Sequence, residues 1–470
     1  MYKGKALFYN IIQFGLSTFL PKAITFFMVP LYTYCMSTEE YGVVDLLNST
    51  VQLLLPFVTL QVQDAVFRYS LDKECRPADV FTIGIRVLCI GTAVFSLLII
   101  IARQAKLLEL NSRYLLFLTF AVFSGGFRNI STYFCRGIEK IKCITISNVG
   151  TTIVIVMCNL WFLLLLNWGI NGYLLAICAG NCFGGLWIFF HAQLYRYIKL
   201  RVEDKKLIRR IIVFSMPMIF SALSWWANTS LDKYILRYYC DNSSVGLLAV
   251  AYKIPAILSL FGTAISSAYS ICAVKGFDKN DTDGFLGYSY HMISSCYVIL
   301  CAVLILLNVF LAKLLFSNEF FSAWRYVPPL LFSALFSLIS LSCEQFFIAL
   351  QKTHLISITA ILGALLNSGL NILLIPRFEA YGAAVSTCIS FFGVWICRYI
   401  LLRRYLHMKN SFSHECVSYF LLLLLVEFAY FGTRFLILQT LIVCGILLLN
   451  KNCILTLIRT VFSLRRITKH

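Results

Sequence analysis

Charged side chains interrupt long apolar runs in this sequence. Three cations lie well inside such runs: Lys22 in FLPKAITFF, Arg86 in FTIGIRVLCI and Arg128 in SGGFRNIST. A charge inside a lipid bilayer costs on the order of a few kcal/mol, so it is retained where it faces a water-filled cavity or a partner. We therefore expect these cations to line a cavity with an excess of positive charge. A pyrophosphate group suits such a cavity, because arginine grips its oxygens in a bidentate fork and lysine acts as a mobile point charge.

Among the further charges inside apolar runs, five are candidate site residues, and their roles stay open at this point. Asp64 lies in the second run and Lys253 in the eighth. Asp232 and Lys233 are adjacent near the outer end of the seventh run, where a structural partnership competes with coupling or gating. Glu344, near the cytoplasmic end of the tenth run, favours a helix-packing or gating contact. We take Asp64, Asp232, Lys233 and Glu344 as the candidate coupling or gating residues.

The sequence contains none of the common nucleotide-binding, hydrolase and metal-site motifs. It contains no GxxxxGK[ST], HExxH or GxSxG pattern and no CxxC pair, and its 18 cysteines are scattered, many within apolar runs. We predict no catalytic residue, no metal site and no cofactor, and therefore a protein that is not an enzyme. Substrate movement would then depend on an ion gradient, the membrane potential or consumption of the substrate on the far side.

Composition identifies the elements that must position these charges. The 470 residues are 60% hydrophobic and 13% charged, against roughly 45–50% and about 25% in soluble domains. Long apolar runs without alternation predict helices rather than a barrel. They fall near residues 7–34, 44–70, 80–102, 114–135, 144–166, 171–195, 211–237, 245–272, 286–310, 326–350, 355–376, 380–402, 416–431 and 434–450. The predicted fold class is an all-α polytopic membrane protein with about 14 transmembrane helices.

The net charge of +19 is carried mainly by short loops between these runs. Lys and Arg concentrate in alternate loops, above all in the stretch 196–210 and the C-terminal tail, which predicts that both termini are cytoplasmic. Because the basic residues do not form a water-exposed face on a soluble domain, they do not indicate a nucleic-acid partner.

An internal repeat divides the chain into two like-oriented halves. The segment around Asn159 matches the segment around Asn371, and both halves open with a proline-bearing run. We expect two pseudo-symmetric six-helix lobes, at 1–200 and 201–410, followed by two extra helices and a basic tail at 411–470. Two similar bundles that rock around a shared central site are an arrangement that transporters use.

Three segments carry a resemblance to a known family. SMPMIFSALSWWANTSLDKYILRYYCDNSSVGLLAVAYKIPAIL (215–258), FLPKAITFFMVPLYTYCMSTEEYGVVDL (19–46) and LNILLIPRFEAYGAAVST (370–387) resemble polysaccharide-biosynthesis (O-antigen) flippases. These belong to the multidrug/oligosaccharidyl-lipid/polysaccharide exporter superfamily. The resemblance covers about residues 5–405.

The resemblance implies a flippase that moves an undecaprenyl-pyrophosphate-linked oligosaccharide across the bacterial inner membrane for O-antigen, capsule or exopolysaccharide assembly. It makes Lys22, Arg86, Arg128 and Lys253 contacts of the pyrophosphate or of acidic sugars, and Asp232–Lys233 the family's pair in the seventh span. Further partners would be the lipid bilayer and the polymerase and chain-length proteins of the same pathway.

Other functions remain open. A lipid II flippase of peptidoglycan synthesis shares the expected helix count and cationic cavity. A cation-coupled multidrug exporter of the same superfamily would use central carboxylates, which Lys22 disfavours. A membrane glycosyltransferase, polymerase or ligase would need a large external loop, and the sequence has none.

Overall fold

The computed structural model divides into two compact units, Met1–Tyr234 (unit 1) and Ile235–His470 (unit 2). It describes residues 19–72, 74–106, 111–199, 204–262, 265, 281, 284–350, 352–406, 412–451, 453 and 455. Across these ranges the secondary structure is helical and contains no strand, which confirms the predicted all-α class. The division between the units falls within α9 (Lys205–Tyr239), and the predicted lobe boundary at residue 200 lies just before this helix.

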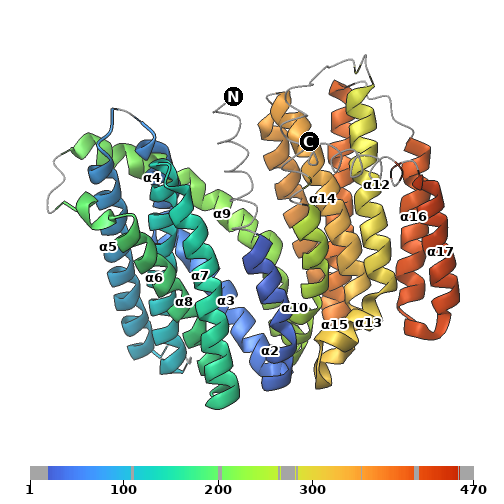
Figure 1. The fold of residues 1–470 in the computed structure, drawn as a ribbon, viewed down its shortest axis with the longest axis horizontal. Helices are drawn as coiled ribbons and strands as arrows, with labels where there is room; N and C mark the ends of the chain where they lie inside the picture. The colour runs from blue at the N-terminus through green and yellow to red at the C-terminus, as the bar shows by residue number, and fades with distance from the viewer. Residues whose placement is uncertain are drawn as a thin grey trace, which may run out of the picture. The chain divides into compact units, whose positions relative to one another are not determined.

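Unit 1 is a bundle of long helices (Figure 1). After a helical stretch over 19–27 it contains α2 (Val29–Cys35), α3 (Thr38–Val58), α4 (Val62–Ser70), α5 (Pro77–Gln104), α6 (Ser112–Gly137), α7 (Ile141–Asn159), the π-helical turn Leu160–Leu165, α8 (Gly169–His191) and the 3-10 turn Leu194–Tyr197. α7 packs along α8, and α6 contacts α3, α4, α5, α7 and α8. Side chains on α6 can therefore reach most of the bundle.

Local sequence explains where these helices begin and break. Ser37 and Glu40 form a capping box at the start of α3, since each side chain accepts a hydrogen bond from the other residue's backbone N–H (3.2 and 2.9 Å). Pro77 occupies the first turn of α5, where its missing N–H costs nothing. Leu60 and Gln61 have φ values of 49° and 51°, and this left-handed pair separates α3 from α4.

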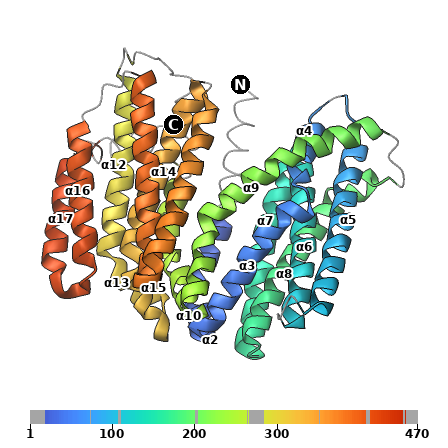
Figure 2. The same ribbon diagram turned by 180° about the vertical axis from the view of Figure 1, so that it is seen from behind.

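Unit 2 is also built of helices (Figures 1 and 2). They are α10 (Asn242–Ala251), α12 (Phe285–Leu306), α13 (Asn308–Leu315), the 3-10 turn Asn318–Arg325, α14 (Val327–Ala349), α15 (Thr353–Tyr405), α16 (Phe412–Ala429), the 3-10 turn Gly432–Phe435 and α17 (Leu436–Leu449). α15 joins two helices at Glu379, whose φ of 51° marks the turn between them. The last two helices, α16 and α17, lie side by side at one edge of unit 2, next to α12.

Within the described residues the expected spans coincide with these helices; residues 7–18 of the first expected span, and 263–264 and 266–272 of the eighth, lie outside the described residues. In the described part of the chain, ten helices are long and apolar enough to cross a membrane, and one of them is the double helix α15. The remaining expected spans correspond to the helical residues from 19 to 35, to α6 and to α16. This is a multi-pass membrane protein, and the expectation of about 14 helices fits the observed elements.

Candidate functional site

Arg128 on α6 lies among three helices of unit 1. Its two terminal nitrogens donate hydrogen bonds to the side-chain oxygens of Asn148 on α7 and Asn181 on α8, each at 3.0 Å. Both partners are neutral amides, and within the described ranges no carboxylate lies at ion-pair distance from Arg128. A guanidinium carries five N–H donors, so these two bonds position the group and leave its charge uncompensated.

Because Gly184 has no side chain, Arg128 can pack directly against α8 at this position. A Cβ there would overlap the Thr151 hydroxyl and lie 3.1 Å from the Arg128 Nε. The Ser147 hydroxyl donates to the Gly184 carbonyl at 2.9 Å and ties α7 to α8. Small residues at such crossings let helices in a membrane approach closely.

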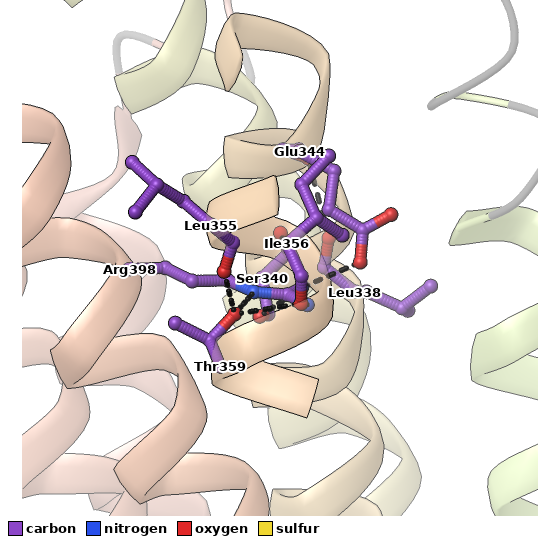
Figure 3. Close-up of polar contacts among 8 residues, drawn as sticks. Leu338, Ser340, Glu344, Leu355, Ile356, Thr359 and Arg398 are labelled. Carbon is purple, nitrogen blue, oxygen red and sulfur yellow. Dashed lines mark hydrogen bonds and ion pairs between the residues drawn. The ribbon is translucent and has the colours of Figure 1, made fainter. Parts of the chain in front are cut away.

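Unit 2 contains a second intramembrane arginine, Arg398, in the second half of α15 (Figure 3). Its Nε donates to the Thr359 hydroxyl (2.9 Å), and one terminal nitrogen donates to the Ser340 hydroxyl (2.8 Å) and forms an ion pair with Glu344. The other terminal nitrogen reaches the Ile356 carbonyl at 3.4 Å. All three nitrogens of Arg398 are hydrogen-bonded and its charge is neutralised. Arg398 therefore joins α14 to the two halves of α15.

The two arginines differ in their partners. Arg398 in unit 2 pairs with the Glu344 carboxylate, whereas the side-chain partners of Arg128 among the described residues are the amides of Asn148 and Asn181.

A second charged cluster of unit 1 joins α3 and α9. The Lys233 amine forms a 2.8 Å ion pair with Asp45 and lies 3.4 Å from the Ser49 hydroxyl. Asp232 is buried and accepts a hydrogen bond from the backbone N–H of Lys233 at 2.9 Å. The indole N–H of Trp226 donates to the Ser49 carbonyl (2.8 Å) and supports the same helix contact.

The other predicted site residues are spread over both units. Lys22 is exposed in the stretch 19–27, and half-buried Arg86 on α5 donates to the Lys199 carbonyl at 3.3 Å. Asp64, in the first turn of α4, accepts a hydrogen bond from the Gln61 amide at 3.1 Å. Lys253 is half-buried in unit 2, directly after α10.

Several residues of these clusters were not predicted from the sequence. Arg398 stands inside the apolar stretch FFGVWICRYILL, so the criterion that singled out Arg86 and Arg128 applied to it as well. Asn148 and Asn181 gave a weaker signal, since asparagines in spans are common helix contacts. No group of three or more His, Cys, Asp or Glu side chains suited to a metal occurs among the described residues.

Comparison with known proteins identifies the family. Residues 7–271 match the family of polysaccharide biosynthesis proteins, which covers more than half of the chain. The chain belongs to this family. The family assignment confirms the resemblance drawn from the segments at 19–46 and 215–258.

Two curated relatives are distant. An uncharacterized membrane protein of Methanocaldococcus jannaschii is 23% identical over 256 residues, 52% of this chain and 50% of that protein. A probable low-salt glycan biosynthesis flippase of Haloferax volcanii is 22% identical over 217 residues, 46% of each chain. The chain thus spans about half the length of the curated relatives it matches.

Solved structures show the fold over nearly the whole chain. The lipid II flippase MurJ, in an inward closed conformation, matches with a TM-score of 0.73 at 14% identity, over 95% of this chain and all of that one. An inward-facing multidrug resistance MATE transporter matches with a TM-score of 0.66 at 12% identity, over 84% and 97%. The family member described here therefore has the fold shared by MurJ and MATE transporters.

Proposed function

We propose that this protein is a flippase that moves an undecaprenyl-pyrophosphate-linked oligosaccharide repeat unit across the membrane by alternating access. The observation that carries the proposal is the uncompensated charge of Arg128, held by two amide oxygens in the middle of unit 1. The family match and the MurJ/MATE fold support a transporter rather than an enzyme.

The contrast between the two arginines supports a substrate role for Arg128. A charge inside a membrane span without a counter-ion destabilises the protein by on the order of a few kcal/mol. Half-buried Arg128 carries this penalty, and unit 2 avoids it by placing Glu344 beside Arg398. Unit 1 keeps the cost, which is the expected signature of a site whose counter-ion arrives with the substrate. A pyrophosphate supplies that counter-ion, since arginine pairs with phosphate oxygens in a bidentate manner.

Lys22, Arg86 and Lys253 complete the proposed set of cationic contacts. Arg86 bonds a backbone carbonyl in this conformation, so a contact with substrate requires it to exchange that partner. Lys22 is exposed and half-buried Lys253 belongs to the other unit, which makes these two the weaker members of the set.

We assign coupling or gating to the carboxylate-bearing contacts. The Lys233–Asp45 pair fixes α9 on α3, with Asp232 directly beside it, and its rupture would release that contact. Asp64 and the Glu344–Arg398 pair are the other candidates. Because Arg398 bonds four other groups in addition to Glu344, its pair fits a fixed helix contact better than a moving gate.

We further propose that the protein resides in the bacterial inner membrane with both termini in the cytoplasm, beside the polymerase and chain-length proteins of its pathway. In a cysteine-free background, cysteines at the exposed positions Glu39 and Lys205 test the orientation. A membrane-impermeant thiol reagent added to intact cells should label the first position and spare the second. The reverse pattern would overturn the orientation.

The pool of lipid-linked sugars tests the proposed function. A strain without this protein should accumulate undecaprenyl-pyrophosphate carrying complete repeat units, measured by mass spectrometry of lipid extracts, and the wild-type protein should clear it. Arg128→Gln should leave the pool accumulated, while the matched control Arg113→Gln, which changes an exposed arginine at the N-terminal end of α6, should reduce it to the wild-type level. An unchanged pool in the deletion strain would refute the proposal, and accumulation of lipid II instead would assign the protein to peptidoglycan synthesis.

A further inference from the structure

A basic hollow of about 390 Å³ lies at one end of unit 1, apart from Arg128. Four cationic side chains line it: Arg76 before α5, Lys140 before α7, and Arg196 and Lys199 after α8. They come from three separate connections that the distribution of Lys and Arg places in the cytoplasm. The volume falls within the range of roughly 300–1,000 Å³ that is usual for small-molecule sites.

One face of α5 holds the wall of this hollow in place. Asp79, Thr82 and Arg86 follow one another at helical spacing and all bind the segment after α8. Asp79 pairs with the Lys199 amine at 2.8 Å, and Arg86 donates to the Lys199 carbonyl. The Thr82 hydroxyl donates to the Tyr197 carbonyl and accepts from the Lys199 N–H, both at 3.0 Å. The wall is therefore fixed before any ligand binds.

The opposite wall is anchored in a similar way. The Lys140 amine donates to the Ala192 carbonyl at 2.8 Å, which joins the α6–α7 connection to the end of α8. This bond fixes the position of the cation and leaves its charge in place. The hydrophobic core of unit 1 continues directly beneath, with Ala192 and Leu194 fully buried.

The charge balance of the lining is positive. Asp79 neutralises Lys199, while Arg76, Lys140 and Arg196 meet no carboxylate among the residues that line the hollow. Glu139 faces the adjacent cavity of about 640 Å³, which shares Lys140. Three converging cations on a fixed frame form a site for a multiply charged anion, and arginine side chains suit its phosphate oxygens.

We propose that this hollow binds a phosphate or pyrophosphate group at the cytoplasmic end of unit 1. The group can belong to an anionic lipid headgroup, since basic pockets between helices at this depth bind such headgroups, or to a soluble phosphorylated molecule. None of the residues that line the hollow belongs to the proposed cationic contacts of the substrate, although Arg86, one of those contacts, bonds the Lys199 carbonyl in its wall. Binding of a phosphate in the hollow can therefore be measured whether or not the protein is a flippase.

Two probes on the purified full-length protein distinguish the sources. In the first, nanodiscs contain phosphatidylglycerol in phosphatidylcholine, and native mass spectrometry counts the phosphatidylglycerol that stays bound. In the second, pure phosphatidylcholine nanodiscs are titrated with inorganic pyrophosphate by calorimetry. Retention in the first assay identifies a lipid headgroup, and binding in the second alone identifies a soluble phosphate.

The variant Arg76→Gln/Arg196→Gln removes two exposed cations of the lining, and Lys205→Gln/Arg209→Gln removes two exposed cations of α9 that do not line it. At about fivefold per cationic side chain, the first variant should bind its probe about thirtyfold more weakly, and the second should bind like the wild type. Equal binding by both variants, or no binding of either probe by the wild type, would overturn the proposal. Gel filtration checks that each variant keeps the folded state.

Discussion

The substitution Asn148→Asp places a carboxylate beside Arg128 without changing the size of the side chain. The Asn148 oxygen already accepts a 3.0 Å hydrogen bond from the guanidinium, so an aspartate there can form an ion pair with no movement of α6 or α7. Unit 1 would then carry the same neutralised arginine that Glu344 and Arg398 form in unit 2. This change separates the structural role of Arg128 from its proposed role in transport.

The two roles predict opposite effects. A neutral hydrogen bond is worth about 0.5–1.5 kcal/mol and one to a charged group about 1.5–3 kcal/mol, so Asn148→Asp should stabilise the protein by up to about 1 kcal/mol. Transport should fall, because the substrate loses a charge-assisted bond to Arg128. A loss of about 1.5–3 kcal/mol corresponds to roughly a ten- to hundredfold weaker interaction with the pyrophosphate.

Two assays on the same variant read out these effects. Thermal unfolding in detergent, followed by size-exclusion chromatography, gives the stability, and the lipid-linked sugar pool of a complemented deletion strain gives the transport. Asn111→Asp is the matched control: it adds the same charge at the exposed N-cap of α6, where aspartate caps as well as asparagine. If a stable Asn148→Asp protein reduces the lipid-linked sugar pool to the wild-type level, the free charge of Arg128 is not needed for transport.

Three further substitutions test the helix contacts. Glu344→Gln should lower the free energy of unfolding by about 2 kcal/mol. This is less than the 3–5 kcal/mol of a fully buried pair, because the Glu344 side chain is 25% exposed. In a double-mutant cycle, adding Arg398→Leu should restore part of the lost stability. Lys233→Met should destabilise the contact with α3 and impair export, and the charge swap with Asp45→Lys/Lys233→Asp should recover both; a swap no better than the single variant would contradict the pairing. Gly184→Ala should lower the free energy of unfolding by about 1–3 kcal/mol, because the added methyl group overpacks the contact between α7 and α8. If this variant unfolds at the same temperature as the wild type, α8 moves away to accommodate the methyl group.

Much of the fold follows from the sequence because lipid restricts the options. Apolar runs of sufficient length must be helical in a bilayer, so the described parts of the expected spans coincide with observed helices. The turn at Glu379 falls between two of these spans, whereas the left-handed pair Leu60–Gln61 divides the expected span 44–70 into α3 and α4. The repeat inferred from Asn159 and Asn371 stays a prediction; both side chains are buried in their own units.

The pairing of intramembrane charges could be predicted only in part. The cost of a charge in a membrane singled out Arg128 and Lys233, but which groups face them depends on helix rotation and crossing. Lys233 finds Asp45 across nearly 190 positions of sequence. The partner of Arg86 could not be predicted either. Its place in an apolar run predicts a cavity-lining side chain, and in the structure it donates a hydrogen bond to the Lys199 carbonyl.

Reconstituted transport measures whether the charge of Arg128 is needed to flip a pyrophosphate-linked lipid. Proteoliposomes that contain the purified protein and a fluorescent polyprenyl-pyrophosphate-linked oligosaccharide report flipping as loss of accessibility to an impermeant quencher. We expect flipping by the wild type and by Arg113→Gln, and a rate at least about tenfold lower for Arg128→Gln. Equal rates for Arg128→Gln and the wild type would contradict the claim that the charge of Arg128 binds the pyrophosphate.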